Sequence, residues 1–182
     1  MSSWHTYPSI FGFGHKAIQD LLKGEVIVEE KVDGSQFSFG KFEILDDHHV
    51  MDGWTGDFEL KVRSRGAVMY PDAPEKMFSK GVAHVKSILH LLKPGWTYRA
   101  EYLSKPKHTA LAYDRIPTGH LMIFDINTSE EEFLSYDEKV TEAHRIGLEC
   151  VPLLFSGIIE NIEEFRRFLN TTSILGGQKI EG

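Results

Sequence analysis

The sequence predicts an α+β domain built of mainly antiparallel sheets with helices packed outside. Segments rich in β-branched and aromatic residues are separated by segments whose apolar residues recur at helical spacing. Turn dipeptides such as Asp33-Gly34 are typical of antiparallel connections. With 182 residues, of which 41% are hydrophobic and 12% aromatic, the chain can build a substantial core. We therefore expect residues 1–182 to form one domain.

Helical signals occur in four places. The segments 16–23 and 74–93 carry apolar residues at helical spacing, and the second begins at a proline and ends at Pro94-Gly95. Ser135-x-x-Glu138 is a capping box that opens a third helix, which we expect to end at Gly147. Asn161-x-x-Glu164 is a variant of the same box and opens the fourth.

Strand signals lie between the helices, at 26–31, 36–42, 58–63, 97–103, 120–126 and 149–155. Two short polar connections, Asp33-Gly34 and the segment 46–49, look like tight turns between antiparallel strands. Adjacent histidines on a strand point to opposite faces, so a polar hairpin tip explains His48-His49 better than a metal site does. A cleft between sheets is the expected place for a ligand.

Several classes of protein are excluded by composition. The amino terminus has no basic region followed by an apolar run, and no stretch of 18 apolar residues occurs, so we expect a soluble, cytoplasmic protein without a membrane segment. We also expect a monomer. A single cysteine, Cys150, excludes disulfides within the chain and is best explained as a small buried thiol. A net charge of -7 argues against nonspecific coating of nucleic acid, so any such contact should be local.

The most informative segment ends a β-branched strand with Lys31, just before Gly34. A lysine can act as a nucleophile only after it loses its proton. Glu29, Glu30 and Asp33 favour the protonated amine unless they point elsewhere or a metal ion offsets them. Taken alone, Lys-x-Asp-Gly is a short pattern that a surface strand end followed by a turn explains more often.

Further motifs follow this lysine in a fixed order. They are Lys31-Val32-Asp33-Gly34, Ser64-Arg65-Gly66, Arg99-Ala100-Glu101-Tyr102-Leu103, Met122-Ile123-Phe124-Asp125-Ile126 and Lys179-Ile180-Glu181-Gly182. The ordered set resembles the signatures of the covalent nucleotidyltransferase superfamily, which comprises DNA ligases, RNA ligases and mRNA capping enzymes. The resemblance covers the chain from Val26 to its last residue. It implies the fold of a ligase adenylation domain, which is ATP-grasp-like.

The resemblance assigns a role to each signature residue. It makes Lys31 the nucleophile that takes AMP from ATP, with Asp33 and Gly34 as the rest of its nucleotide-binding signature. It makes Glu181 a catalytic, metal-linked carboxylate and Glu101 a ribose or metal contact. The alternative for Glu101 is a solvated ion pair with Arg99, which should lie on the same face of the strand.

The remaining assignments concern the base and the phosphates. Phe124 is implied to stack on adenine, although a buried core phenylalanine would look the same in sequence. Arg65 has donors suited to phosphate or ribose oxygens, with an exposed charge as the alternative. One of Glu29 or Glu30 is implied to read the adenine amino group. Magnesium is expected with the triphosphate because it bridges and neutralises phosphate oxygens.

Among the superfamily, the segments 101–126 and 147–152 with Leu175-Gly176-Gly177 resemble phage and bacterial RNA-repair ligases. This implies that AMP passes to a 5′-phosphate RNA end and that a 3′-hydroxyl end then displaces it, in the host cytoplasm if the protein comes from a phage. Asp33 is the choice typical of DNA ligases, so a DNA ligase is the alternative. Lys105, Lys107 and His108 form a basic loop that either meets an RNA backbone or is simply solvated.

The superfamily pattern continues beyond Glu-Gly with a strand and a final lysine signature that contacts the α-phosphate, and this sequence stops at Gly182. We expect the domain to be truncated at its carboxy-terminal end, with a missing segment as a partner. Such a chain should bind adenine nucleotide more readily than it reacts with it. The alternative of another class is a noncatalytic nucleotide-binding or RNA-binding module.

Overall fold

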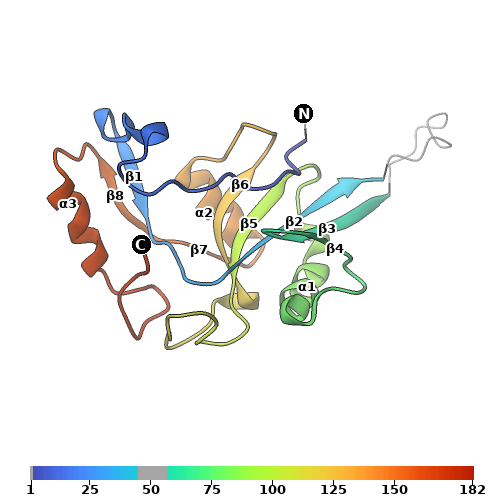
Figure 1. Cartoon of the computed structure of the whole chain (residues 1–182). Helices are drawn as coiled ribbons and strands as arrows, with labels where there is room; N and C mark the ends of the chain where they lie inside the picture. Colours follow the sequence, from blue (N-terminus) through green and yellow to red (C-terminus); the bar gives the residue numbers. More distant parts are fainter. Residues whose placement is uncertain (1, 45–56) are drawn as a thin grey trace.

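The computed structural model describes residues 2–44 and 57–182 (Figure 1). The expected turn at 46–49 and its histidine pair lie outside these residues. The strands are β1 (Val26–Glu29), β2 (Ser35–Glu43), β3 (Phe58–Ser64), β4 (Val68–Met69), β5 (Thr97–Tyr102), β6 (Leu121–Asn127), β7 (Glu149–Cys150) and β8 (Leu153–Gly157). The α-helices are α1 (Ser79–Ser87), α2 (Tyr136–Arg145) and α3 (Ile162–Arg167). Short 3₁₀ turns occupy Lys16–Ile18, Leu21–Lys23, Lys76–Phe78, Leu89–Leu91, Thr118–His120 and Phe168–Asn170.

Two sheets form the framework. The larger has the order β4-β3-β2-β5-β6-β7, and the smaller pairs β1 with β8. Among the described strands, every pair is antiparallel except β6 with β7, which is parallel. The α+β class and the mainly antiparallel sheets are therefore confirmed. None of the helices in the described residues is long and apolar enough to cross a membrane.

The main core lies between the six-stranded sheet and helices α1 and α2. Alternate strand residues such as Phe37, Phe39 and Ile123 meet Val82 of α1 and Ala143 of α2, all nearly inaccessible to solvent. The opposite face of the sheet carries the amino-terminal segment, which passes along it toward β1 (Figure 1). A second cluster on that side of β6 contains Val32, Leu103, Tyr113, Met122, Val151 and Leu175.

The helix predictions hold best where a cap is present. The Ser135 capping box opens α2, and Asn161 accepts a hydrogen bond from the Glu164 amide at the start of α3. A single helix over 16–23 is wrong, since two 3₁₀ turns without a buried residue form there. A helix over 74–93 is too long: α1 has no side-chain cap and continues into 3₁₀ turns at both ends, the tighter geometry common at helix termini.

Two strand predictions are also corrected. The expected strand 149–155 is split into β7 and β8, which belong to different sheets, because Pro152 cannot donate to a ladder. Asp33-Gly34 does not close a hairpin, since β1 and β2 do not pair. Glycine is required there for another reason: a Cβ on Gly34 would lie 2.8 Å from the carbonyl oxygen of Tyr102 and 3.1 Å from a carboxylate oxygen of Glu101.

Candidate functional site

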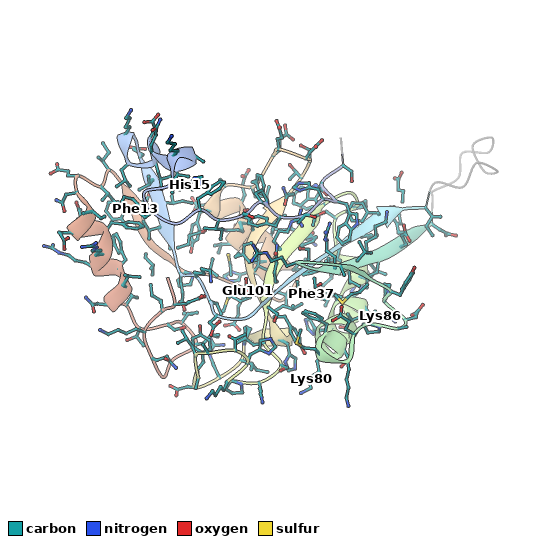
Figure 2. All side chains as sticks on the ribbon, viewed as in Figure 1. Phe13, His15, Phe37, Lys80, Lys86 and Glu101 are labelled. Carbon is teal, nitrogen blue, oxygen red and sulfur yellow. The ribbon has the colours of Figure 1, made fainter. Side chains whose placement is uncertain are left out.

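A cleft of about 920 Å³ opens between the two sheets. This volume suits a ligand of nucleotide size. Most of the residues that the sequence nominates line it, namely Glu29, Glu30, Lys31, Gly34, Arg65, Glu101 and Phe124, together with Tyr7, Gln36, Asp125, Val151 and Gly182. They come from β1 and the connection that follows it, from β2, β5 and β6 of the larger sheet, from the loop after β3, and from the amino-terminal segment, the β7–β8 connection and the carboxy terminus. Figure 2 shows Glu101 near the middle of the molecule.

Lys31 follows the end of β1, where the chain crosses to the larger sheet. Its backbone amide donates to the Gly182 carbonyl at 2.7 Å, so the carboxy-terminal residues lie against it. Its amine donates to the Glu181 carboxylate, and both side chains are partly exposed, at 48% and 37%. The structure thus brings Lys31 and Glu181 together across 150 positions of sequence. The amine is accessible to a ligand in the cleft.

Asp33 is engaged by backbone groups of the loop that follows β5. Its carboxylate accepts hydrogen bonds from the backbone amides of Ala110 and Leu111, at 2.9 and 2.7 Å. Its own amide donates to the Tyr113 hydroxyl at 2.8 Å. Hydrogen bonds from Thr109 and these two amides help to hold the pKa of Asp33 below its usual value, against the effect of burial. Asp33 therefore fastens the segment 109–113 to the connection that follows Lys31.

Arg99 and Glu101 share a face of β5, as expected, but they do not form an ion pair. Arg99 is fully buried and donates to the side chains of Asn127 and Ser38 and to the carbonyls of Ser3 and His5. Its donors are thus used to hold the amino-terminal segment on the sheet. The alternative of an Arg99–Glu101 salt bridge is wrong, and Glu101 is left facing the cleft.

Glu101 is a carboxyl group with a perturbed titration. Burial raises its pKa from 4.5 to about 7, and the Glu181 and Asp33 carboxylates act in the same direction, against Lys31 and Arg65. The carboxylates of Glu101 and Glu181 therefore lie near the Lys31 amine and repel each other. A divalent cation would relieve this repulsion, and a nucleotide triphosphate can supply the oxygen ligands that the protein does not.

The raised pKa of Glu101 predicts a pH-dependent stability. Between pH 4.5 and about 7 the folded protein binds more protons than the unfolded chain, so the free energy of unfolding falls as the pH rises through this window. Glu101→Gln should flatten this fall. Urea unfolding in metal-free buffer across the window measures it, and an identical slope in the variant would show that Glu101 titrates normally.

The two glutamates before Lys31 have different surroundings. Glu30 is buried, and its carboxylate accepts from the Ser173 hydroxyl and from the Ile174 amide, the latter at 2.9 Å. It anchors the carboxy-terminal segment. Glu29 accepts a hydrogen bond at 2.6 Å from Lys139, a nearly buried lysine of α2. Burial raises the pKa of Glu29, and the hydrogen bond from Lys139 opposes this.

Phe124 lies at a bulge in β6. Arg99 pairs with Asp125 while Ala100 pairs with Ile123, so Phe124 is the extra residue between them. Bulges re-aim side chains, and here both Phe124 and Asp125 line the cleft. The Tyr7 ring packs edge-on against Phe124 with centroids 5.1 Å apart, and its hydroxyl donates to Asp125 at 2.8 Å. Phe124 is half-buried, with one side against the second cluster.

Sequence reasoning missed several contributors. Tyr7 carries no signal in sequence, because only long-range packing brings it to the cleft. His108 is expected either to meet an RNA backbone or to be solvated, and neither alternative includes the contact that forms: its Nε2 lies 2.9 Å from the Ser35 hydroxyl at the start of β2. Cys150 is half-buried, and burial raises the pKa of its thiol to about 11, as expected for an unreactive cysteine.

A model of the RNA ligase family matches residues 24–182 of this chain. The chain belongs to the RNA ligase family. The match leaves out only the amino-terminal segment, and it favours RNA ligase over the DNA ligase alternative. A comparison of this sequence with curated proteins found no match.

Solved structures of RNA ligase from Naegleria gruberi share the fold. A lysine-to-alanine mutant with ATP and Mn aligns with a TM-score of 0.64 at 15% identity, over 91% of this chain and 47% of that one. The ligase with PPi aligns with a TM-score of 0.59 at 16% identity, over 97% of this chain and 52% of that one. An aspartate-to-alanine mutant without ligand aligns with a TM-score of 0.62 at 15% identity, over 91% and 47%. This chain spans about half the length of these ligases.

Proposed function

We propose that this RNA ligase family member is an ATP-dependent adenylyltransferase domain in which Lys31 forms a covalent lysyl-AMP. The observation that carries the proposal is the cleft itself. One accessible amine, Lys31, stands there beside the Glu181 carboxylate, with Glu101 and Phe124 arriving from two other strands. A nucleophile, carboxylates for a phosphate-bound cation and an aromatic platform are the groups that adenylyl transfer needs.

The base of the nucleotide fits against Phe124. Its half-buried ring is fixed by the bulge and by the Tyr7 edge, so little ordering is needed when a base stacks on it. Glu29 is the better candidate of the two glutamates for the adenine amino group, since the carboxylate of Glu30 is already used by Ser173 and Ile174. Arg65, exposed at the rim, is placed for phosphate or ribose oxygens.

In the first step the neutral amine of Lys31 attacks the α-phosphorus of ATP, a P–N bond forms, and pyrophosphate leaves with the electrons of the broken P–O bond. The proton released from the amine has an acceptor in Glu181, which already receives a hydrogen bond from it. AMP then passes to the 5′-phosphate of an RNA end, and a 3′-hydroxyl displaces AMP as the phosphodiester forms.

Glu101 and Glu181 are the residues that would hold a divalent cation. No group of three metal-binding side chains occurs in the described part of the chain, so the remaining ligands would be phosphate oxygens and water, as Mg²⁺ commonly prefers. A bound cation would neutralise part of the phosphate charge and would offset the negative charge of the carboxylates around the amine. The Naegleria structures with ATP and Mn support a nucleotide with a divalent metal, and Mg²⁺ is our proposal for this chain.

The proposal is tested by intact-mass measurement after incubation with ATP and Mg²⁺ or Mn²⁺. We expect a mass increase of one AMP that accumulates slowly with release of pyrophosphate, because the sequence predicts that this chain binds adenine nucleotide more readily than it reacts with it. The purified adduct is then given 5′-phosphorylated RNA or DNA of the same sequence, and RNA should discharge AMP faster. No adduct with either metal would overturn the adenylyltransferase proposal, whereas faster discharge by DNA would overturn the assignment of RNA as substrate.

Phe124→Ala should weaken ATP binding by roughly 1–3 kcal/mol, the contribution of one stacking aromatic. Isothermal titration with ATP measures it. Phe133→Ala is the matched control, because Phe133 is also near Tyr7 but does not line the cleft. Unchanged ATP affinity together with a large fall in the melting temperature of Phe124→Ala would show that Phe124 serves only the core.

A further inference from the structure

A row of cationic side chains runs along one face of β3. Alternation along the strand places Leu60 and Val62 in the core and turns Lys61 and Arg63 to the other face. Arg63 pairs with Ser38, which accepts a hydrogen bond from Arg99, so this is the face that carries the cleft. Beyond the strand end, Arg65 lines the cleft itself. We call Lys61, Arg63 and Arg65 the β3 cationic row.

The spacing of the row suits a polynucleotide backbone. Alternate residues of a strand are about 6.7 Å apart, which is close to the separation of successive phosphates along a nucleic acid strand. Its members are also available: Arg65 is exposed, and Lys61 and Arg63 are half-exposed. In the described residues neither arginine has a carboxylate within salt-bridge distance, whereas Lys61 lies 3.2 Å from Glu59.

Aromatic rings accompany the row. The guanidinium carbon of Arg63 lies 5.9 Å from the centroid of the Trp4 ring. The Trp4 ring also packs against the Phe42 ring, with centroids 5.5 Å apart. The Lys61 amine sits over Phe42 at 5.2 Å. Proteins that bind single-stranded nucleic acid combine cationic side chains for the phosphates with aromatic rings on which bases of any sequence stack. The row offers the cations, and the partly exposed Trp4 beside it offers an aromatic ring.

From this geometry we infer that the β3 cationic row is a track for the phosphates of a single RNA strand whose end lies in the cleft. The inference rests on the proposed function, since it names the path that the RNA takes away from Lys31. The chain has a net charge of -7, which disfavours nonspecific binding of nucleic acid over its whole surface. RNA binding would therefore be confined to a local cationic surface such as this row.

The test compares the double variant Lys61→Gln, Arg63→Gln with the wild-type protein by fluorescence anisotropy on a short 5′-phosphorylated single-stranded RNA. The logarithm of the affinity falls with the logarithm of the salt concentration, and each phosphate contact adds about 0.7 to the steepness of this fall. Loss of two contacts should therefore make the fall shallower by roughly 1.4. The affinity should fall on the order of tenfold at about 0.1 M salt, equally for RNAs of different sequence. The control variant Lys80→Gln, Lys86→Gln removes the same charge from α1, on the other side of the sheet (Figure 2), and should bind as the wild type does.

Because Arg63 also donates to Thr6 at 2.7 Å, the single variant Lys61→Gln, which leaves that contact in place, should show half of the slope change. An unchanged slope in the double variant, an equal loss in the α1 control, or no RNA binding by the wild-type protein would each overturn the inference. AMP labelling of the wild-type protein is measured separately. Its failure would remove the proposed function and leave the RNA-binding result standing.

Discussion

Lys31→Ala is expected to abolish transfer of AMP to the protein while leaving the fold intact. The amine is accessible in the cleft and is the nucleophile that we propose, with the carboxylates of Glu101 and Glu181 near it. Its side chain is 48% exposed and fills no part of the core, so its removal should change stability by less than about 0.5 kcal/mol. Intact mass after incubation with ATP and metal measures the labelling, and thermal unfolding measures the fold.

The matched control is Lys179→Ala. Lys179 is also an exposed lysine near the carboxy terminus, but its amine donates to Asn170 at 2.7 Å and does not line the cleft. This variant should label as the wild type does. Labelling that persists in Lys31→Ala would mean that another amine is the nucleophile, and labelling lost in both would point to a general effect of the carboxy-terminal segment.

Arg99→Met should be the most destabilising single change near the site, by about 3–5 kcal/mol. The guanidinium is fully buried, and its loss leaves Asn127 and two backbone carbonyls without their donor. The same change releases the segment that places Tyr7 against Phe124, so nucleotide affinity should fall as well. Urea unfolding gives the first quantity, and ATP titration under conditions where the variant is folded gives the second.

Arg166→Met is the control for that experiment, because the Arg166 side chain is 62% exposed and forms an ion pair with Glu163 in α3. Its effect should stay below about 1 kcal/mol, the usual range for a surface ion pair. If Arg99→Met is no more destabilising than this control, the buried hydrogen bonds of Arg99 do not hold the amino-terminal segment.

Much of the fold was predictable because strands such as β2 and β3 place alternate apolar residues in the core. The segment expected at 36–42 is β2, Ser35–Glu43, and its register follows from Phe37 and Phe39 in the core. The Ser135 capping box predicted the start of α2 correctly, because it supplies hydrogen-bond partners for amides that have none within the helix. The split at Pro152 was missed because sequence shows an apolar run but not a change of sheet.

The site was predictable only in part. The signature residues Lys31 and Glu101 do meet in the cleft, yet the bulge that turns both Phe124 and Asp125 toward it depends on the pairing of β5 with β6. The positions of Tyr7 and Lys139 depend on contacts over more than 100 positions of sequence, Tyr7 with Asp125 and Lys139 with Glu29. Short-range patterns carry no information about such contacts.

The central claim is that ATP binds in the cleft and that its AMP is attached to Lys31. The most direct measurement is peptide mapping by mass spectrometry of protein incubated with ATP and a divalent metal. The account predicts an acid-labile AMP on the peptide that contains Lys31, lost in Lys31→Ala and suppressed by added pyrophosphate. AMP found on any other residue, with the Lys31 peptide unmodified, would contradict it.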